Sequence, residues 1–138
     1  MKLQTETLEF RTQGQGDLVD ITPAVQARLA ASGLAEGQAT VFVVGSTAAI
    51  TTFEYEPGLK KDMARLYEAL APAGKEYAHH QTWGDDNGSS HVRAALQGPS
   101  LTVPFKEGRL MLGVWQQIVL AEFDTRPRDR QVVVQLPG

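Results

Sequence analysis

Residues 39–54 read ATVFVVGSTAAITTFE, and this run sets the architecture of the chain. Its first part, residues 39–44, is a continuous apolar segment rich in β-branched residues, which predicts a buried central strand. Five small or hydroxylated residues follow, among them Ser46 and Thr47, and extended character then resumes at residues 50–54. The small-residue run has two interpretations. It is either a β-bulge or tight bend between two strands, or a place where the backbone approaches a ligand closely.

Strand and helix patterns precede and follow this run. Residues 3–10 alternate polar and apolar side chains and include β-branched threonines, which predicts an opening strand at a sheet edge or with one face toward solvent. Thr22 followed by Pro23 predicts a helix start with Thr22 as N-cap, and Gly33 predicts its end. A second helix is expected over residues 59–70, where apolar side chains recur at helical intervals.

The C-terminal part of the chain predicts an antiparallel hairpin over residues 101–112, with a turn at Lys106-Glu107-Gly108-Arg109. We expect its second strand to continue through residues 113–120, with Trp115 filling the core. Either Gln116 or Gln117 then faces inward, because adjacent strand residues point to opposite sides.

The last segments are a charged stretch and a short apolar run. Residues 124–130, DTRPRDR, predict a solvated turn from their charge and proline content. The valines at residues 132–134 predict a strand that closes the sheet.

Length and composition exclude several classes of protein. The chain has 138 residues and 42% hydrophobic content, which fits one compact domain. It has no cysteine, so any bound metal must use His, Asp or Glu. The net charge of −3 and the lack of a Lys or Arg run argue against nucleic-acid and anionic-membrane partners. Without a signal core or an apolar run of about 20 residues, we expect a soluble cytoplasmic protein with no membrane partner.

Residues 77–96, YAHHQTWGDDNGSSHVRAAL, contain all 3 histidines of the chain. His79 and His80 precede a glycine-bounded turn that carries Asp86 and Asn87. The glycines permit positive φ, and Asp and Asn side chains bond readily to nearby backbone. This segment is therefore the expected place of any chemistry.

The third histidine follows the same turn. Ser89 or Ser90 is expected to cap a short helix that ends at Gly98, which places His91 in the first helical turn. The turn then folds His91 back toward His79. A helix N-terminus disfavours imidazolium and favours neutral imidazole, the form that binds metal, and it also suits a phosphate or carboxylate.

A purely structural interpretation of the histidines also stays open. A histidine pair beside an Asp-Asn-Gly turn is also typical of a solvated loop in which one His caps a helix. The HExxH and CxxC spacings of zinc sites are absent, so the local pattern is not specific for metal.

Six separated segments carry a resemblance to a known family. They are GSTAAITTFEYEPGL (45–59), Y-x-H (77–79), W-G-D-D-N-x-x-SHVRAAL (83–96), GPSLTVPF (98–105), GxLMLGVWQQIVLAEFD (108–124) and PRDRQVVVQL (127–136). In this order they resemble the YjbQ-like uncharacterised protein family, which is associated with secondary thiamine-phosphate synthase activity. The resemblance implies one α/β domain of α+β type over residues 1–138, with a mostly antiparallel sheet and flanking helices. It also implies a homotrimer with sites near subunit interfaces.

The resemblance further implies a clustered polar site. His79 and His91 match the family's histidine positions, Glu54 matches its acidic residue, and Trp115 and Gln116 match its tryptophan signature.

Two departures from the family pattern bear on metal binding. One branch of the family has His where this chain has Gly45, and the Gly-Thr-Trp-Gln signature has Val114 in second place. A metal would therefore be held by His79 and His91. Its further donor would be an oxygen from Glu54, Asp86 or water, or His80 as a substitute.

We therefore expect a small enzyme resembling secondary thiamine-phosphate synthase that acts on a phosphorylated small molecule. The expected catalytic residues are Glu54, His91 and Gln116, the ligand-binding residues are Ser46, Thr47, Asp86, Asn87 and Trp115, and the ligands for zinc or another divalent metal are His79 and His91. We expect His79 and His91 to share one ligand, and His80 to point away because adjacent residues of an extended segment face opposite sides. The alternatives are a non-catalytic trimer that binds metal or a small ligand, and a purely structural oligomer.

Overall fold

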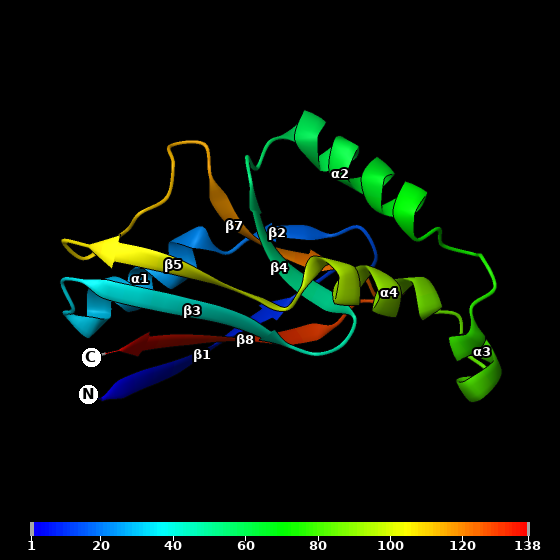
Figure 1. The fold of residues 1–138 in the computed structure, drawn as a ribbon, viewed down its shortest axis with the longest axis horizontal. Coiled ribbons are helices and arrows are strands. Elements are labelled where there is room, and N and C mark those ends of the chain that lie inside the picture. The colour runs from blue at the N-terminus through cyan, green and yellow to red at the C-terminus, as the bar shows by residue number, and fades with distance from the viewer. Residues whose placement is uncertain (1, 138) are drawn as a thin grey trace.

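The computed structural model describes residues 2–137 as two antiparallel sheets and four helices (Figure 1). The strands are β1 (Leu3–Arg11), β2 (Leu18–Asp20), β3 (Gly37–Val44), β4 (Ala48–Phe53), β5 (Ser100–Lys106), β6 (Arg109–Leu110), β7 (Gln117–Glu122) and β8 (Asp129–Pro137). The helices are α1 (Thr22–Ser32), α2 (Pro57–Leu70), α3 (Ala78–Trp83) and α4 (Gly88–Gln97). This is the predicted α+β class, with a curled antiparallel sheet system and flanking helices.

The sheets and helices form layers. One sheet has five strands in the order β1-β8-β3-β5-β6, and the other has three in the order β2-β7-β4. The main core lies between the two sheets and includes α1. A second, smaller core joins the other face of the three-stranded sheet to α2 and α4. Figure 1 shows α3 at the end of the molecule opposite the two termini.

The first strand and the first two helices form where the sequence predicts them. β1 pairs only with β8, so it is an edge strand. α1 ends at Gly33, whose φ of 72° is left-handed. Its N-cap is Ile21 and not Thr22, because the Thr22 hydroxyl instead accepts a hydrogen bond from the Ile118 N–H at 2.7 Å and so ties α1 to β7.

The central strand is buried on one face only, and the expectation of a fully buried strand is wrong. Val41 and Val43 are 0% exposed, whereas Phe42 is 42% and Val44 48% exposed. Because β3 lies in an antiparallel sheet with the core on one side, its side chains alternate between core and surface. The apolar outer face is therefore uncovered in a single chain.

Residues 113–116 do not continue a strand, and Trp115 does not fill the core. The Gln116 N–H donates to the Gly113 carbonyl at 3.0 Å, and the Gln116 side chain accepts from the Gly113 N–H at 3.0 Å. These two bonds close a turn, so β7 begins only at Gln117. Trp115 is 71% exposed, and it is Gln117 that accepts a hydrogen bond from the Tyr55 N–H at 2.8 Å.

The charged segment at residues 124–130 is partly buried, contrary to the solvated turn that its composition predicts. Arg130 is 7% exposed and Asp124 is 1% exposed. Arg130 donates through Nε to Glu122, which is 0% exposed, at 2.8 Å and through Nη2 to the Thr47 hydroxyl at 2.7 Å. Charge therefore does not imply solvation here, because the buried charges pair with one another.

The Glu122–Arg130 pair gives a prediction about stability. Glu122→Gln removes the charge that compensates a buried guanidinium, and we expect it to lower the free energy of unfolding by about 3–5 kcal/mol. Urea unfolding followed by circular dichroism at fixed protein concentration measures the change. The matched control is Glu6→Gln, whose pair with Arg28 is 44% and 42% exposed and is expected to be worth at most about 1 kcal/mol. Equal small losses for both variants would contradict the prediction.

Candidate functional site

Two histidines from different helices face each other. The imidazole rings of His79 in α3 and His91 in α4 have centroids 4.4 Å apart and are tilted by 49°. Gly84 ends α3 with a left-handed φ of 67°, and the chain then turns back into α4. The prediction that a glycine-bounded turn brings these two histidines together is confirmed.

His80, the neighbouring histidine, bonds to the start of α4 and not to the other histidines. His80 Nε2 accepts a hydrogen bond from the Gly88 N–H at 2.9 Å, so it satisfies a free donor at the start of α4. The absence of a side chain at Gly88 allows His80 to come this close. A Cβ at this position would lie 2.9 Å from His80 Nε2 and 2.5 Å from the Tyr77 Cβ. His80 is thus kept from the His79–His91 pair, although not for the expected reason, because His79 and His80 lie in a helix and not in an extended segment.

The start of α4 also differs from expectation. Its N-cap is Asn87, and neither Ser89 nor Ser90 caps it. Both serines are buried inside the helix, at 2% and 0% exposure. The helix still places His91 within its first turns, with the His91 N–H donating to the Asn87 carbonyl at 3.3 Å.

A carboxylate that sequence reasoning missed orients His79. Asp85 Oδ1 lies 3.2 Å from His79 Nε2, whereas the expected Asp86 is exposed and makes no hydrogen bond or ion pair with a histidine within residues 2–137. Turned with its nitrogen toward Asp85, the Asn87 amide donates to both Asp85 oxygens at 3.2 Å. In the opposite orientation the amide nitrogen would donate to Asp124 Oδ1 instead, at the longer distance of 3.4 Å. A carboxylate contact of this kind fixes the orientation of the imidazole ring.

The second histidine is held in its neutral form. Burial, and then the neighbouring His79, hold the pKa of His91 below its usual value, although Asp124 and Asp85 act in the opposite sense. Asp124 is held as a carboxylate. Burial alone raises its pKa, but the Thr125 N–H and the Arg128 guanidinium outweigh burial and keep that pKa below its usual value.

A surface hollow of about 350 Å³ adjoins His91. Its walls are the small-residue turn after β3 and one side of α4, and they are mainly apolar. The lining residues are Gly45, Ser46, Ala48, His91, Ala94, Ala95 and Pro99. Thr47 does not line it, since its hydroxyl donates to Asp124 at 3.1 Å and accepts from Arg130. The small-residue run is thus a bend between two strands that also forms a wall of the hollow.

The remaining predicted site residues lie elsewhere in the chain. Glu54 follows the far end of β4, six residues beyond Ala48, and a strand of that length spans about 20 Å. Gln116 donates to the Thr52 hydroxyl at 3.2 Å near the same end. Within one chain, Glu54, Trp115 and Gln116 therefore do not meet the histidines.

The donor set of one chain falls short of a complete metal site. Across residues 2–137, no three His, Asp or Glu side chains are grouped as metal ligands would be. Zinc sites use three or four protein ligands. His79 and His91 supply two imidazoles, so one chain lacks at least one ligand of a zinc site.

Comparison with known proteins decides the family. A sequence model described as "UPF0047 protein YjbQ-like" matches residues 6–138. The chain belongs to the YjbQ-like UPF0047 family. A UPF0047 protein of Methanothermobacter thermautotrophicus is 39% identical over 100% of this chain and 94% of its own length. YugU of Bacillus subtilis, another UPF0047 protein, is 34% identical over 96% of this chain and 98% of its own length.

Solved structures support the same YjbQ-like fold. A YbjQ-like protein of unknown function from Sulfolobus solfataricus has a TM-score of 0.88 and 30% identity, with 99% of each chain covered. A hypothetical protein of Aeropyrum pernix has a TM-score of 0.89 and 31% identity, with 98% of each chain covered. In the part of this YjbQ-like chain that the structure describes, no helix has the length and apolar character needed to cross a membrane.

The lowered pKa of His91 predicts a pH-dependent stability. As the pH falls through 6.5, the unfolded chain gains a proton that the folded His91 resists, so the stability due to this group is present above pH 6.5 and is lost below it. We expect the NMR titration midpoint of His91 in metal-free protein to lie below 6.5. His91→Gln should reduce the fall in stability between about pH 7.5 and pH 5.5. A His91 midpoint above 6.5 would contradict the prediction.

Proposed function

We propose that this protein is a small cytoplasmic enzyme that acts on a phosphorylated small molecule, with chemistry resembling that of secondary thiamine-phosphate synthase. The observation that carries the proposal is the His79–His91 pair, with ring centroids 4.4 Å apart, beside a hollow of about 350 Å³. A concave site with converging titratable groups is the usual setting of small-molecule chemistry.

The two imidazoles take different parts in this proposal. His79 is oriented through its Nε2, which lies 3.2 Å from Asp85 Oδ1 and 3.1 Å from the Asn87 amide. His91 lines the hollow and has a lowered pKa from burial, so near neutral pH it is uncharged and suited to act as a base. Ser46 lines the same hollow and supplies a hydroxyl for ligand binding.

A homotrimer would bring the other predicted residues into the site. Glu54, Trp115 and Gln116 are too distant from His91 in one chain, but a neighbouring copy can present them across an interface. Val114 and Trp115 are 83% and 71% exposed, which is unusual for large apolar side chains without a partner. A ring of three copies covers such surfaces with one repeated heterologous contact.

Light scattering tests the assembly directly. We expect a mass of three times the 15.0 kDa chain at micromolar concentration. Val114→Lys should shift the mass toward monomer, because it places a charge in the expected interface. Lys75→Ala, on an exposed residue after α2, is the surface control and should leave the mass unchanged. A monomeric mass for the unaltered protein would exclude the shared site.

The paired imidazoles also support a second candidate function. Two His side chains with converging rings suit zinc or another divalent metal if water or a neighbouring copy supplies the remaining donors. In that case the protein is a non-catalytic trimer that binds metal or a small ligand.

One set of variants tests the site under both functions. Phosphate monoesters and diphosphates, with and without zinc, are screened by thermal shift, and hits are assayed for product. We expect His79→Ala and His91→Ala to weaken ligand or zinc binding by at least about tenfold to a hundredfold. His80→Ala should lower stability through the lost α4 cap but leave binding intact.

The product assay distinguishes the two functions. Formation of a product supports the enzyme, whereas binding without product supports the non-catalytic binding protein. Equal effects of all three variants on binding, or none for His91→Ala, would exclude the shared site.

A further inference from the structure

Asn87 is the only asparagine of the chain, and a glycine follows it. An asparagine amide is lost when the backbone nitrogen of the next residue attacks its Cγ atom and ammonia leaves. Glycine in the next position favours this attack, because no side chain hinders the nitrogen and the backbone is unusually free to rotate. The step from Asn87 to Gly88 is therefore the one place in the sequence where this reaction is open to an asparagine.

The fold holds Asn87 in a conformation that prevents the attack. Its φ and ψ are −107° and 27°. A ψ of 27° directs the Gly88 nitrogen away from the Asn87 Cβ, whereas ring closure needs the two on the same side of the Cα–C bond. The backbone must therefore rotate about this bond before the nitrogen can reach Cγ.

Three hydrogen bonds oppose that rotation. The Ser90 and His91 N–H groups donate to the Asn87 carbonyl at 3.0 and 3.3 Å. The Gly88 N–H donates to His80 Nε2 at 2.9 Å. The first two bonds are backbone bonds at the start of α4, whereas the third depends on one side chain. His80 is therefore the part of this restraint that a substitution can remove while the backbone bonds of α4 stay in place.

We propose that Asn87 is a deamidation site whose rate is controlled by the hydrogen bond from the Gly88 N–H to His80. Once this bond opens and the backbone rotates, the Gly88 nitrogen gives up its proton to water and bonds to the Asn87 Cγ. The bond from Cγ to the amide nitrogen then breaks, and that nitrogen takes up a proton and leaves as ammonia. Water hydrolyses the cyclic imide at either carbonyl, which restores the Gly88 N–H and leaves aspartate or isoaspartate. This modification is independent of the activity proposed above.

The reaction changes the charge beside the histidine pair. The Asn87 amide nitrogen donates to Asp85 at 3.2 Å in one orientation and to Asp124 at 3.4 Å in the other. After deamidation a carboxylate replaces this donor, and like charges at such distances repel. The isoaspartate product also lengthens the backbone before α4 by one carbon. Deamidation therefore loosens the turn that brings His79 to His91.

Mass spectrometry of the full chain tests the proposal. Folded protein and protein unfolded in guanidinium chloride are incubated at the same neutral pH and then digested. Trypsin releases residues 76–93 as one peptide, because it cleaves after Lys75 and Arg93, and fragmentation assigns the gain in mass to Asn87. We expect deamidation to be at least about tenfold slower in the folded chain, because three hydrogen bonds resist the rotation.

Substitutions of His80 test its part in the restraint. His80→Ala removes the acceptor, and we expect a rate about two- to tenfold higher, which is the effect of losing one hydrogen bond. His80→Phe also lacks the acceptor but keeps a ring that packs against Tyr77, as the His80 ring does at a centroid distance of 5.6 Å, and should show the same increase. His80→Gln supplies an amide oxygen that can accept from Gly88 and should return the rate toward that of the unaltered chain.

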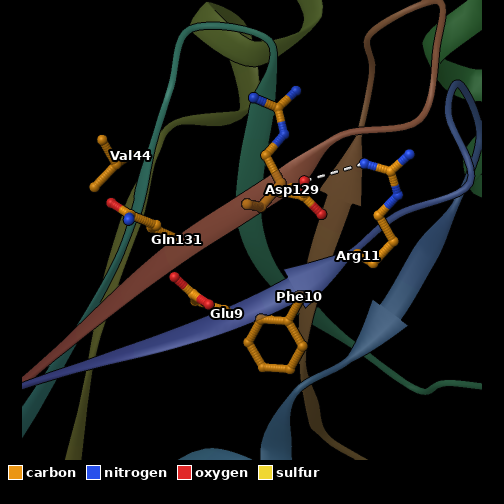
Figure 2. Close-up of a pocket in the computed structure, with 7 residues that line it drawn as sticks. Glu9, Phe10, Arg11, Val44, Asp129 and Gln131 are labelled. Atoms are coloured by element: carbon orange, nitrogen blue, oxygen red, sulfur yellow. Dashed lines mark ion pairs between the residues drawn. The ribbon is translucent and has the colours of Figure 1, made fainter.

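Two controls separate this effect from general loosening of the surface. Gln81→Ala changes the next residue of α3, which is exposed. Arg11→Ala removes an exposed ion pair with Asp129, at 3.2 Å, which Figure 2 shows across β1 and β8 beside a hollow of about 560 Å³. Within residues 2–137, neither member of this pair forms a hydrogen bond or ion pair with α3 or α4. Both controls should leave the rate unchanged.

Circular dichroism identifies the variants that fold, and His80→Phe keeps the test decisive if His80→Ala does not. Equal rates in the folded and unfolded chain would overturn the proposal. It would also be overturned if the folded variants that lack the acceptor react no faster than the unaltered chain, or if the two controls speed the reaction as much as they do.

Discussion

The buried ion pair between Glu122 and Arg130 is the constraint on which the arrangement of this fold depends. Glu122 ends β7 in the three-stranded sheet, and Arg130 lies near the start of β8 in the five-stranded sheet. The pair therefore joins the two sheets at the point where the chain passes between them. Thr12, just after β1, adds a hydrogen bond to Glu122 at 2.7 Å, and Thr47 adds one to Arg130. A buried pair with this many partners fixes one arrangement of strands, although it contributes less to stability than an apolar cluster of equal volume often does.

The same polar cluster extends to the histidine site. Thr47 links Arg130 to Asp124, and Asp124 acts on His91 by opposing the fall in its pKa. The bend between β3 and β4 is thus held from inside by Thr47 while its outer residues form a wall of the hollow beside His91. Core and site share one structural element, and a change in the ion pair would be expected to alter both.

Local patterns in the sequence are sufficient to predict the helices and strands. They do not predict which side chains of each element face the core and which face the solvent. Gly33 marks the end of α1 correctly, because this signal acts on the backbone nearby. The apolar run of β3 does not reveal that Phe42 lies outward, since that depends on which sheet it joins. The burial of Arg130 was equally hidden, because its partner Glu122 is defined only by the fold.

The site itself was predictable only where residues are close in sequence. His79 and His91 meet because a short turn joins α3 and α4, and sequence spacing was enough to foresee it. Asp85 was passed over for Asp86, because the geometry of the turn decides which of two adjacent carboxylates faces the ring. Glu54 matched a family position, but a match does not tell whether residues meet within one chain.

Gly45 matters both in the sequence comparison and in the fold. In sequence it is a missing histidine, which weakens the case for a metal held by three imidazoles. In the fold it is the position where a side chain would collide with Arg130 Nη1. The absence of a side chain at Gly45 thus removes a possible imidazole donor beside the hollow of His91, and it leaves room for the Arg130 guanidinium that bonds to Glu122 and Thr47.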